Sequence, residues 1–85
     1  MHELSIAQDI VMTVMRHLPP QNHAPVRSVK LSIGVLNHLA GDALRFCFEA
    51  ASEGTVLEGA ELEIDETLGD EIRVVEFELE DQRYS

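Results

Sequence analysis

The feature that most constrains this chain is a strict alternation of side-chain types across residues 26–36. One set of alternate positions is apolar and comprises Val29, Leu31, Ile33 and Val35. The positions between them carry small or polar residues, namely Ser28, Lys30, Ser32 and Gly34. Successive side chains of a β-strand point to opposite faces, so this period of two predicts a half-buried strand. Such a strand needs apolar cover on one face, which the rest of the chain must supply.

Two stretches with helical spacing of apolar residues can supply that cover. The first helix is predicted over residues 5–18, starting at a capping box of Ser5 and Gln8 and ending before two prolines. The second is predicted over residues 42–52, and its core stripe comprises Leu44, Cys47, Phe48 and Ala51. Phe46 widens this apolar face, which predicts contact with both the sheet and the first helix.

Two further strands are predicted, over residues 60–65 and 71–80. The connection between them is short and contains Gly69, which indicates a hairpin in which the two strands pair antiparallel. The apolar pattern of the last strand changes face near Val74 and Val75. Either a bulge lies there, or the first half of this strand is covered on both faces.

The order of these elements predicts a two-layer α+β fold of the form αβαββ, in a single domain of residues 1–85. Both helices should pack on one face of a three-stranded sheet. The first strand, the second helix and the second strand should form a right-handed crossover. The last strand has the most continuous apolar content, which favours a central position for it.

The charge of the chain is strongly negative, with a formal net value of −10. Nucleic acids and anionic membranes are therefore disfavoured as partners, because both would repel the chain. Eleven of the sixteen acids fall in residues 58–81, against one base, Arg73. They form either a solvated sheet face that keeps edge strands from aggregating or a docking surface for a basic partner.

Features that the sequence lacks indicate where the protein acts and which kinds of site it does not have. No apolar run reaches transmembrane length, and Gln8 and Asp9 interrupt any signal-peptide pattern, so we expect a cytoplasmic protein. Cys47 is the only cysteine, which excludes an internal disulfide and a cysteine-based zinc site. Its phenylalanine neighbours indicate a buried, inert thiol. Without a nucleophile beside a base, or a phosphate-binding loop, the chain is not expected to be an enzyme.

The amino terminus, Met1-His2-Glu3, combines three groups that bind metal ions. The Met1 amine, the His2 amide nitrogen and the His2 imidazole can chelate one cation through small rings, with Glu3 or a group from another loop completing the set. A compact, nitrogen-rich site of this kind suits Ni(II) or Cu(II). His38, which follows the first strand, is considered as an additional ligand, and a plain turn residue is the alternative interpretation. For the whole motif the alternative is a frayed terminus that binds no metal.

Several motifs, in their order and spacing, resemble one known family. They are Met1-His2-Glu3-Leu4-Ser5-Ile6-Ala7, Ile33-Gly34, Leu44-Arg45-Phe46-Cys47-Phe48-Glu49, Glu53-Gly54-Thr55, Leu57-Glu58-Gly59-Ala60-Glu61-Leu62-Glu63-Ile64, Gly69-Asp70-Glu71-Ile72-Arg73 and Glu78-Leu79-Glu80. In these features the chain resembles the HypA/HybF family of hydrogenase and urease nickel-incorporation accessory proteins. The resemblance implies a cytoplasmic domain that binds nickel at Met1-His2-Glu3. It also implies cooperation with an accessory GTPase and with the nickel-free precursor of a metalloenzyme.

The chain departs from that family between the second and third strands. Family members carry there a zinc ribbon with two Cys-x-x-Cys pairs, whereas residues 66–70 of this chain contain no cysteine, so no zinc is expected. The leading hypothesis is the nickel-binding module of a metallochaperone-like protein that assists nickel insertion into hydrogenase or urease precursors. The alternative is a protein-interaction module of the same fold, which binds a maturation partner without delivering metal.

Overall fold

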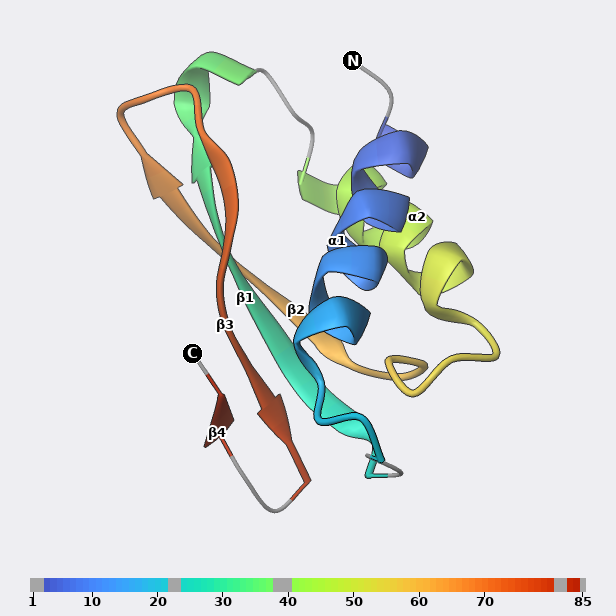
Figure 1. Cartoon of the computed structure of the whole chain (residues 1–85). Coiled ribbons are helices and arrows are strands. Elements are labelled where there is room, and N and C mark those ends of the chain that lie inside the picture. Colours follow the sequence, from blue (N-terminus) through green and yellow to red (C-terminus); the bar gives the residue numbers. More distant parts are fainter. Residues whose placement is uncertain (1–2, 22–23, 38–40, 81–82, 85) are drawn as a thin grey trace.

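The structure is a computed structural model that describes residues 3–21, 24–37, 41–80 and 83–84. Within these residues the chain forms α1 (Glu3–His17), β1 (Val26–Gly34), the 3-10 helix η1 (Val35–Asn37), α2 (Gly41–Ser52), β2 (Glu61–Thr67), β3 (Ile72–Leu79) and β4 (Arg83–Tyr84). Both α1 and α2 lie on one face of the sheet (Figure 1). The predicted two-layer α+β architecture is confirmed, and the two-residue strand β4 adds to the three predicted strands.

β1 is the centre of the sheet, whose strand order is β2-β1-β3-β4. It pairs in parallel with β2 on one side and antiparallel with β3 on the other. The two strands that flank the second helix run parallel, as the predicted crossover requires, and they pair directly with each other. The predicted hairpin between residues 60–65 and 71–80 is wrong, because β1 lies between these strands. Among the three long strands β1, and not the last strand as predicted, takes the middle position, although β3 is flanked on its other side by the two-residue β4.

The short connection between β2 and β3 crosses over the end of β1 instead of turning back as a hairpin. Two backbone hydrogen bonds hold it there. Gly34 N–H donates to Glu71 O at 2.7 Å, and Leu36 N–H donates to Gly69 O at 3.1 Å. A Cβ on Gly34 would overlap the backbone of residues 69 and 70, so this close approach requires glycine. A connection of this length fits a hairpin as well as a crossing, and the contacts with β1 and η1 select the crossing.

A carboxylate also stabilises this connection. Thr67 Oγ1 donates a hydrogen bond to Glu71 Oε2 at 2.5 Å. That bond is the main reason why the pKa of Glu71 lies below its ordinary value, with smaller contributions from the Glu71 backbone, Arg73 and Ser32 that together outweigh the opposing effect of burial. Side-chain and backbone bonds therefore act together where the chain passes from β2 to β3.

The helix boundaries differ slightly from those predicted. α1 begins at Glu3 instead of residue 5, so Ser5 lies inside the first turn and the predicted capping box is wrong. A carboxylate in the first turn interacts favourably with the helix dipole, which explains why Glu3 belongs to the helix. At the other end, His17 Nδ1 donates to Thr13 O at 2.8 Å. The His17 side chain thus bonds to the backbone of the last turns of its own helix.

The core lies between the helices and the sheet. Its apolar members follow the predicted stripes and include Ile10, Val14, Leu31, Ile33, Leu44, Phe48 and Phe77. Cys47 is half-buried and packs against this cluster. The predicted role of Phe46 is wrong, because its side chain is 75% exposed. α2 buries the stripe of Leu44, Phe48 and Ser52, and helical spacing places Phe46 on the opposite side of the helix.

β3 contains the bulge that the sequence allowed. Glu76 pairs with Lys30, and Val74 pairs with the next residue of β1, Leu31, so Val75 is the extra residue in the ladder. The bulge shifts the side-chain alternation of β3 by one position. Of the two predicted explanations for the change of face, the structure therefore selects the bulge.

Candidate metal-binding terminus

Most of the predicted metal ligands lie outside the residues that the structure describes. Met1, His2 and His38 belong to this group. Glu3 is described: it is the first residue of α1, and its side chain is half-buried. The roles of Met1, His2 and His38 stay predictions, whereas Glu3 has a defined place at a helix start.

The start of α1 is anchored by burial within its first two turns. Ile6 is 8% exposed and Ala7 is fully buried, and both belong to the core. The neighbouring Leu4 is 47% exposed. Because the core holds this end of the helix, the backbone of Glu3 has a defined place.

Several chain segments meet at the end of the molecule where α1 starts. The end of η1, the start of α2 and the connection from β2 to β3 all lie at this end (Figure 1). The connection and η1 are joined by the hydrogen bond from Leu36 N–H to Gly69 O. His38 falls in the sequence between η1 and α2. The fold therefore brings the described neighbours of His38 to the same end as Glu3, which any joint ligand set requires.

Side chains alone do not form a metal site in the described part of the chain. No group of three or more His, Cys, Asp or Glu residues is placed there to hold an ion. The predicted ligand set depends instead on the Met1 amine, the His2 amide nitrogen and the His2 ring.

None of the described helices is long and apolar enough to cross a membrane.

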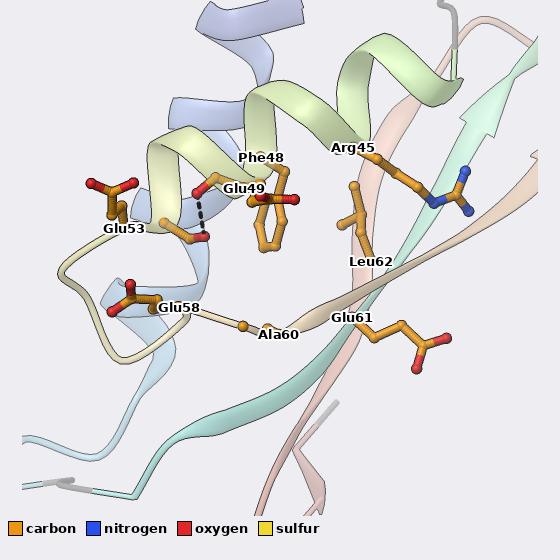
Figure 2. A pocket seen from close by; sticks show the side chains of 10 residues that line it. Arg45, Phe48, Glu49, Glu53, Glu58, Ala60, Glu61 and Leu62 are labelled. Atoms are coloured by element: carbon orange, nitrogen blue, oxygen red, sulfur yellow. Dashed lines mark hydrogen bonds between the residues drawn. The ribbon is translucent and has the colours of Figure 1, made fainter.

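A groove of about 540 Å³ lies between α2 and the start of β2 (Figure 2). Its apolar floor includes Phe48 and Leu62, which are 2% and 5% exposed. Four acidic residues belong to its lining, Glu49, Glu53, Glu58 and Glu61, and the side chain of Glu61 points away from α2 (Figure 2). The sequence predicts the acidic character of residues 58–81 but not this groove, because Glu49 of α2 and Glu53, which directly follows α2, lie outside that stretch. The alternation of acids with apolar residues along residues 61–65 was the available signal.

The family model and the similar proteins point to the same family. The family described as hydrogenase/urease nickel incorporation, metallochaperone, HypA matches residues 1–76. Proteins named hydrogenase maturation factor HypA are similar to this chain, with 43% identity over 70 residues in Methylocella silvestris and 51% over 69 residues in Trichormus variabilis. A hydrogenase maturation factor HypA 2 from Bradyrhizobium diazoefficiens is 44% identical over 69 residues.

These matches cover most of this chain but a smaller share of each relative. The aligned segments cover 82%, 81% and 81% of this chain, but only 62%, 58% and 61% of the three relatives. The chain therefore spans about three fifths of the length of the curated relatives that it matches. The family match extends from the terminal Met-His-Glu motif through the helices and into β3. The chain belongs to the HypA family of hydrogenase and urease nickel-incorporation metallochaperones.

Proposed function

We propose that this chain is the nickel-binding module of a metallochaperone-like accessory protein, which assists nickel insertion into hydrogenase or urease precursors. The observation that carries this function is the family match, which begins at residue 1 and so includes Met1-His2-Glu3. The names of the relatives, hydrogenase maturation factors, support a hydrogenase as the recipient. The module binds and hands on metal and catalyses no reaction of its own.

Nickel is the cargo of this module. The Met1 amine, the His2 amide nitrogen and the His2 imidazole bind Ni(II), and Glu3 completes the set, with His38 as the candidate additional ligand. The nitrogen donors are close together along the chain, so chelation requires little further ordering. All three nitrogens must be unprotonated, and binding therefore releases protons. Affinity should fall as the pH drops through about 6.5, the ordinary pKa of histidine.

The partners of the module are an accessory GTPase and the nickel-free precursor of a metalloenzyme, as the family resemblance implies, and its place of action is the cytoplasm. Residues 1–85 act as a single domain that holds no zinc. Support for the absence of zinc comes from the connection between β2 and β3, which contains no cysteine. The one cysteine of the sequence, Cys47, belongs to α2 and packs against the core.

A nickel titration of protein with an authentic Met1 amine tests the metal site. The native protein should bind one Ni(II), and His2→Ala should lose almost all affinity because the imidazole is removed. One residue added before Met1 should be nearly as damaging, because it displaces the amine. His17→Ala is the matched control, since His17 bonds to its own helix and should not affect nickel. Circular dichroism checks that each variant is folded.

Two comparisons complete this titration, one with the extended protein and one with Cu(II). If the extended protein binds nickel as tightly as the native one, the terminal amine is not a ligand and the proposed site is wrong. Cu(II) is the competing metal, because divalent affinities rise from nickel to copper at most nitrogen sites. A competition titration with both ions therefore establishes which metal the site prefers.

The alternative function is an interaction module that does not deliver metal. It is favoured by the short connection between β2 and β3, where the family that the chain resembles carries a zinc ribbon. In this chain residues 68–71 join the strands directly. Capture of the accessory GTPase with and without nickel separates the two functions. A metal-delivering module should show nickel affinity and a response of partner binding to nickel. Equal capture under both conditions, together with no nickel affinity, would support the alternative.

A further inference from the structure

We propose that the outer edge of β2 is a docking site for an extended, basic segment of a partner protein, which adds to the sheet as a further strand. β2 lies at the end of the strand order and pairs with β1 alone among the described residues. Alternate residues of an edge strand direct N–H and C=O groups outward, and an extended peptide can pair with them. The ladder between β2 and β1 runs without a register shift from Glu61 to Thr67, so this edge is regular.

The other free stretch of sheet edge is less suitable. β3 carries the bulge at Val75, which interrupts its regular pattern of outward groups. β4 already pairs with β3 at Phe77 and Glu78. Among the described strands, β2 is therefore the one that offers a long and uninterrupted edge.

Two hollows follow the edge of β2 on the side of the helices. The larger is the groove of about 540 Å³ at the start of the strand (Figure 2). The smaller, of about 240 Å³, lies further along the strand and is lined by Ile33, Gly41, Arg45, Ile64 and Glu66. Arg45 of α2 lines both, so the two hollows adjoin beside the same strand. Apolar side chains of an added strand can enter them, because Phe48, Leu62 and Ile64 provide an apolar floor.

The opposite face of β2 is acidic. Glu61, Glu63 and Asp65 are exposed on this face, because they alternate with Leu62 and Ile64, which face the helices. Glu61 and Leu62 point to opposite sides of the strand in Figure 2. β2 itself contains no Lys or Arg, and Lys30 of β1 pairs with Asp65 at 3.4 Å. Lys or Arg at alternate positions of an added strand would each lie opposite a carboxylate, which stabilises a sheet.

The same charges argue against a second copy of this chain as the occupant. Pairing of two β2 edges would bring two rows of carboxylates together, and opposed like charges destabilise a sheet. The acidic edge therefore opposes the pairing of two β2 strands and favours a strand with alternating basic and apolar residues. This docking site is independent of nickel, since β2 supplies none of the proposed nickel ligands.

A synthetic peptide of alternating Lys and Val, about eight residues long, tests the site on the full chain without metal. We expect saturable binding, measured by fluorescence anisotropy, together with slower hydrogen exchange at alternate amides of β2. Two derivatives, N-methylated at the odd or at the even residues, keep the charge and differ in which N–H groups are lost. The derivative that lacks the N–H groups facing β2 should bind at least about tenfold more weakly than the other. A peptide of alternating Glu and Val should not bind.

Two charge reversals complete the experiment. Glu63→Lys changes the middle of the acidic row, whereas Asp9→Lys makes the same change in net charge on the exposed surface of α1. The first should weaken binding by at least about tenfold and the second by less than about twofold, with circular dichroism confirming the fold of both. The proposal would be overturned if the two reversals had equal effects, or if the two N-methylated peptides bound equally. Either result would show that general charge attraction accounts for the binding. The absence of saturable binding, or of slower exchange in β2, would overturn it as well.

Discussion

Replacing Gly34 with alanine tests whether the crossing over β1 is held by close backbone contact. The added Cβ would overlap the carbonyl group of Gly69 and lie 2.5 Å from Asp70 N. These are backbone atoms, so no side chain can rotate away, and the connection between β2 and β3 must shift. That shift disturbs the hydrogen bonds from Gly34 N–H to Glu71 O and from Leu36 N–H to Gly69 O.

The expected magnitude follows from these contacts. Overpacking of a well-packed site costs about 1–3 kcal/mol. Each disturbed backbone hydrogen bond contributes about 0.5–1.5 kcal/mol. Alanine in a strand interior recovers about 0.5–1 kcal/mol relative to glycine. We therefore expect Gly34→Ala to lower the free energy of unfolding by about 2–4 kcal/mol, measured by urea denaturation followed by circular dichroism.

Gly59→Ala is the matched control for this measurement. Gly59 has a φ of 80°, and no atom lies within 4 Å of the position that its Cβ would occupy. Its replacement should therefore cost only the left-handed backbone conformation, about 1 kcal/mol. If Gly34→Ala costs no more than Gly59→Ala, close backbone contact does not hold the crossing, and the physical reason given for the strand order is refuted.

Three further measurements follow from the fold. Phe48→Ala should lower the free energy of unfolding by about 3–5 kcal/mol because it empties a buried site, and a loss below about 1 kcal/mol would contradict that burial. The lowered pKa of Glu71 means that its carboxylate stabilises the fold above the ordinary value of 4.5, and that this stabilisation is lost as the pH falls through the lower folded-state pKa. Glu71→Gln should therefore flatten the acid side of the stability–pH curve, and an unchanged slope would contradict the Thr67 contact. A strong chelator should leave the circular dichroism spectrum and Tm unchanged, whereas unfolding on chelation would show that a metal supports the core.

Local patterns in the sequence were sufficient to predict both helices, the central strand and the architecture. The stripes that bury Val14 and Phe48 depend on residues within a few positions of each other. The change of face near Val75 was visible for the same reason, and the structure shows that a bulge causes it. The proposed nickel ligands are also a local feature, because Met1 and His2 are adjacent in the chain. A sequence can specify such features without reference to distant residues.

The strand order, by contrast, was decided only by the tertiary structure. In the ladder Gly34 pairs with Thr67 and Ile33 pairs with Ile72, so the two partners of β1 come from opposite ends of one short connection. The same length of connection fits a hairpin, and no local pattern distinguishes the two. The exposure of Phe46 has a similar origin, since the contacts of α2 with the sheet and α1 determine which stripe is buried. The sequence by itself determined which segments become helices and strands, because those choices depend on neighbouring residues. Which strands pair, and hence which edge stays free, depends on contacts between residues far apart in the chain.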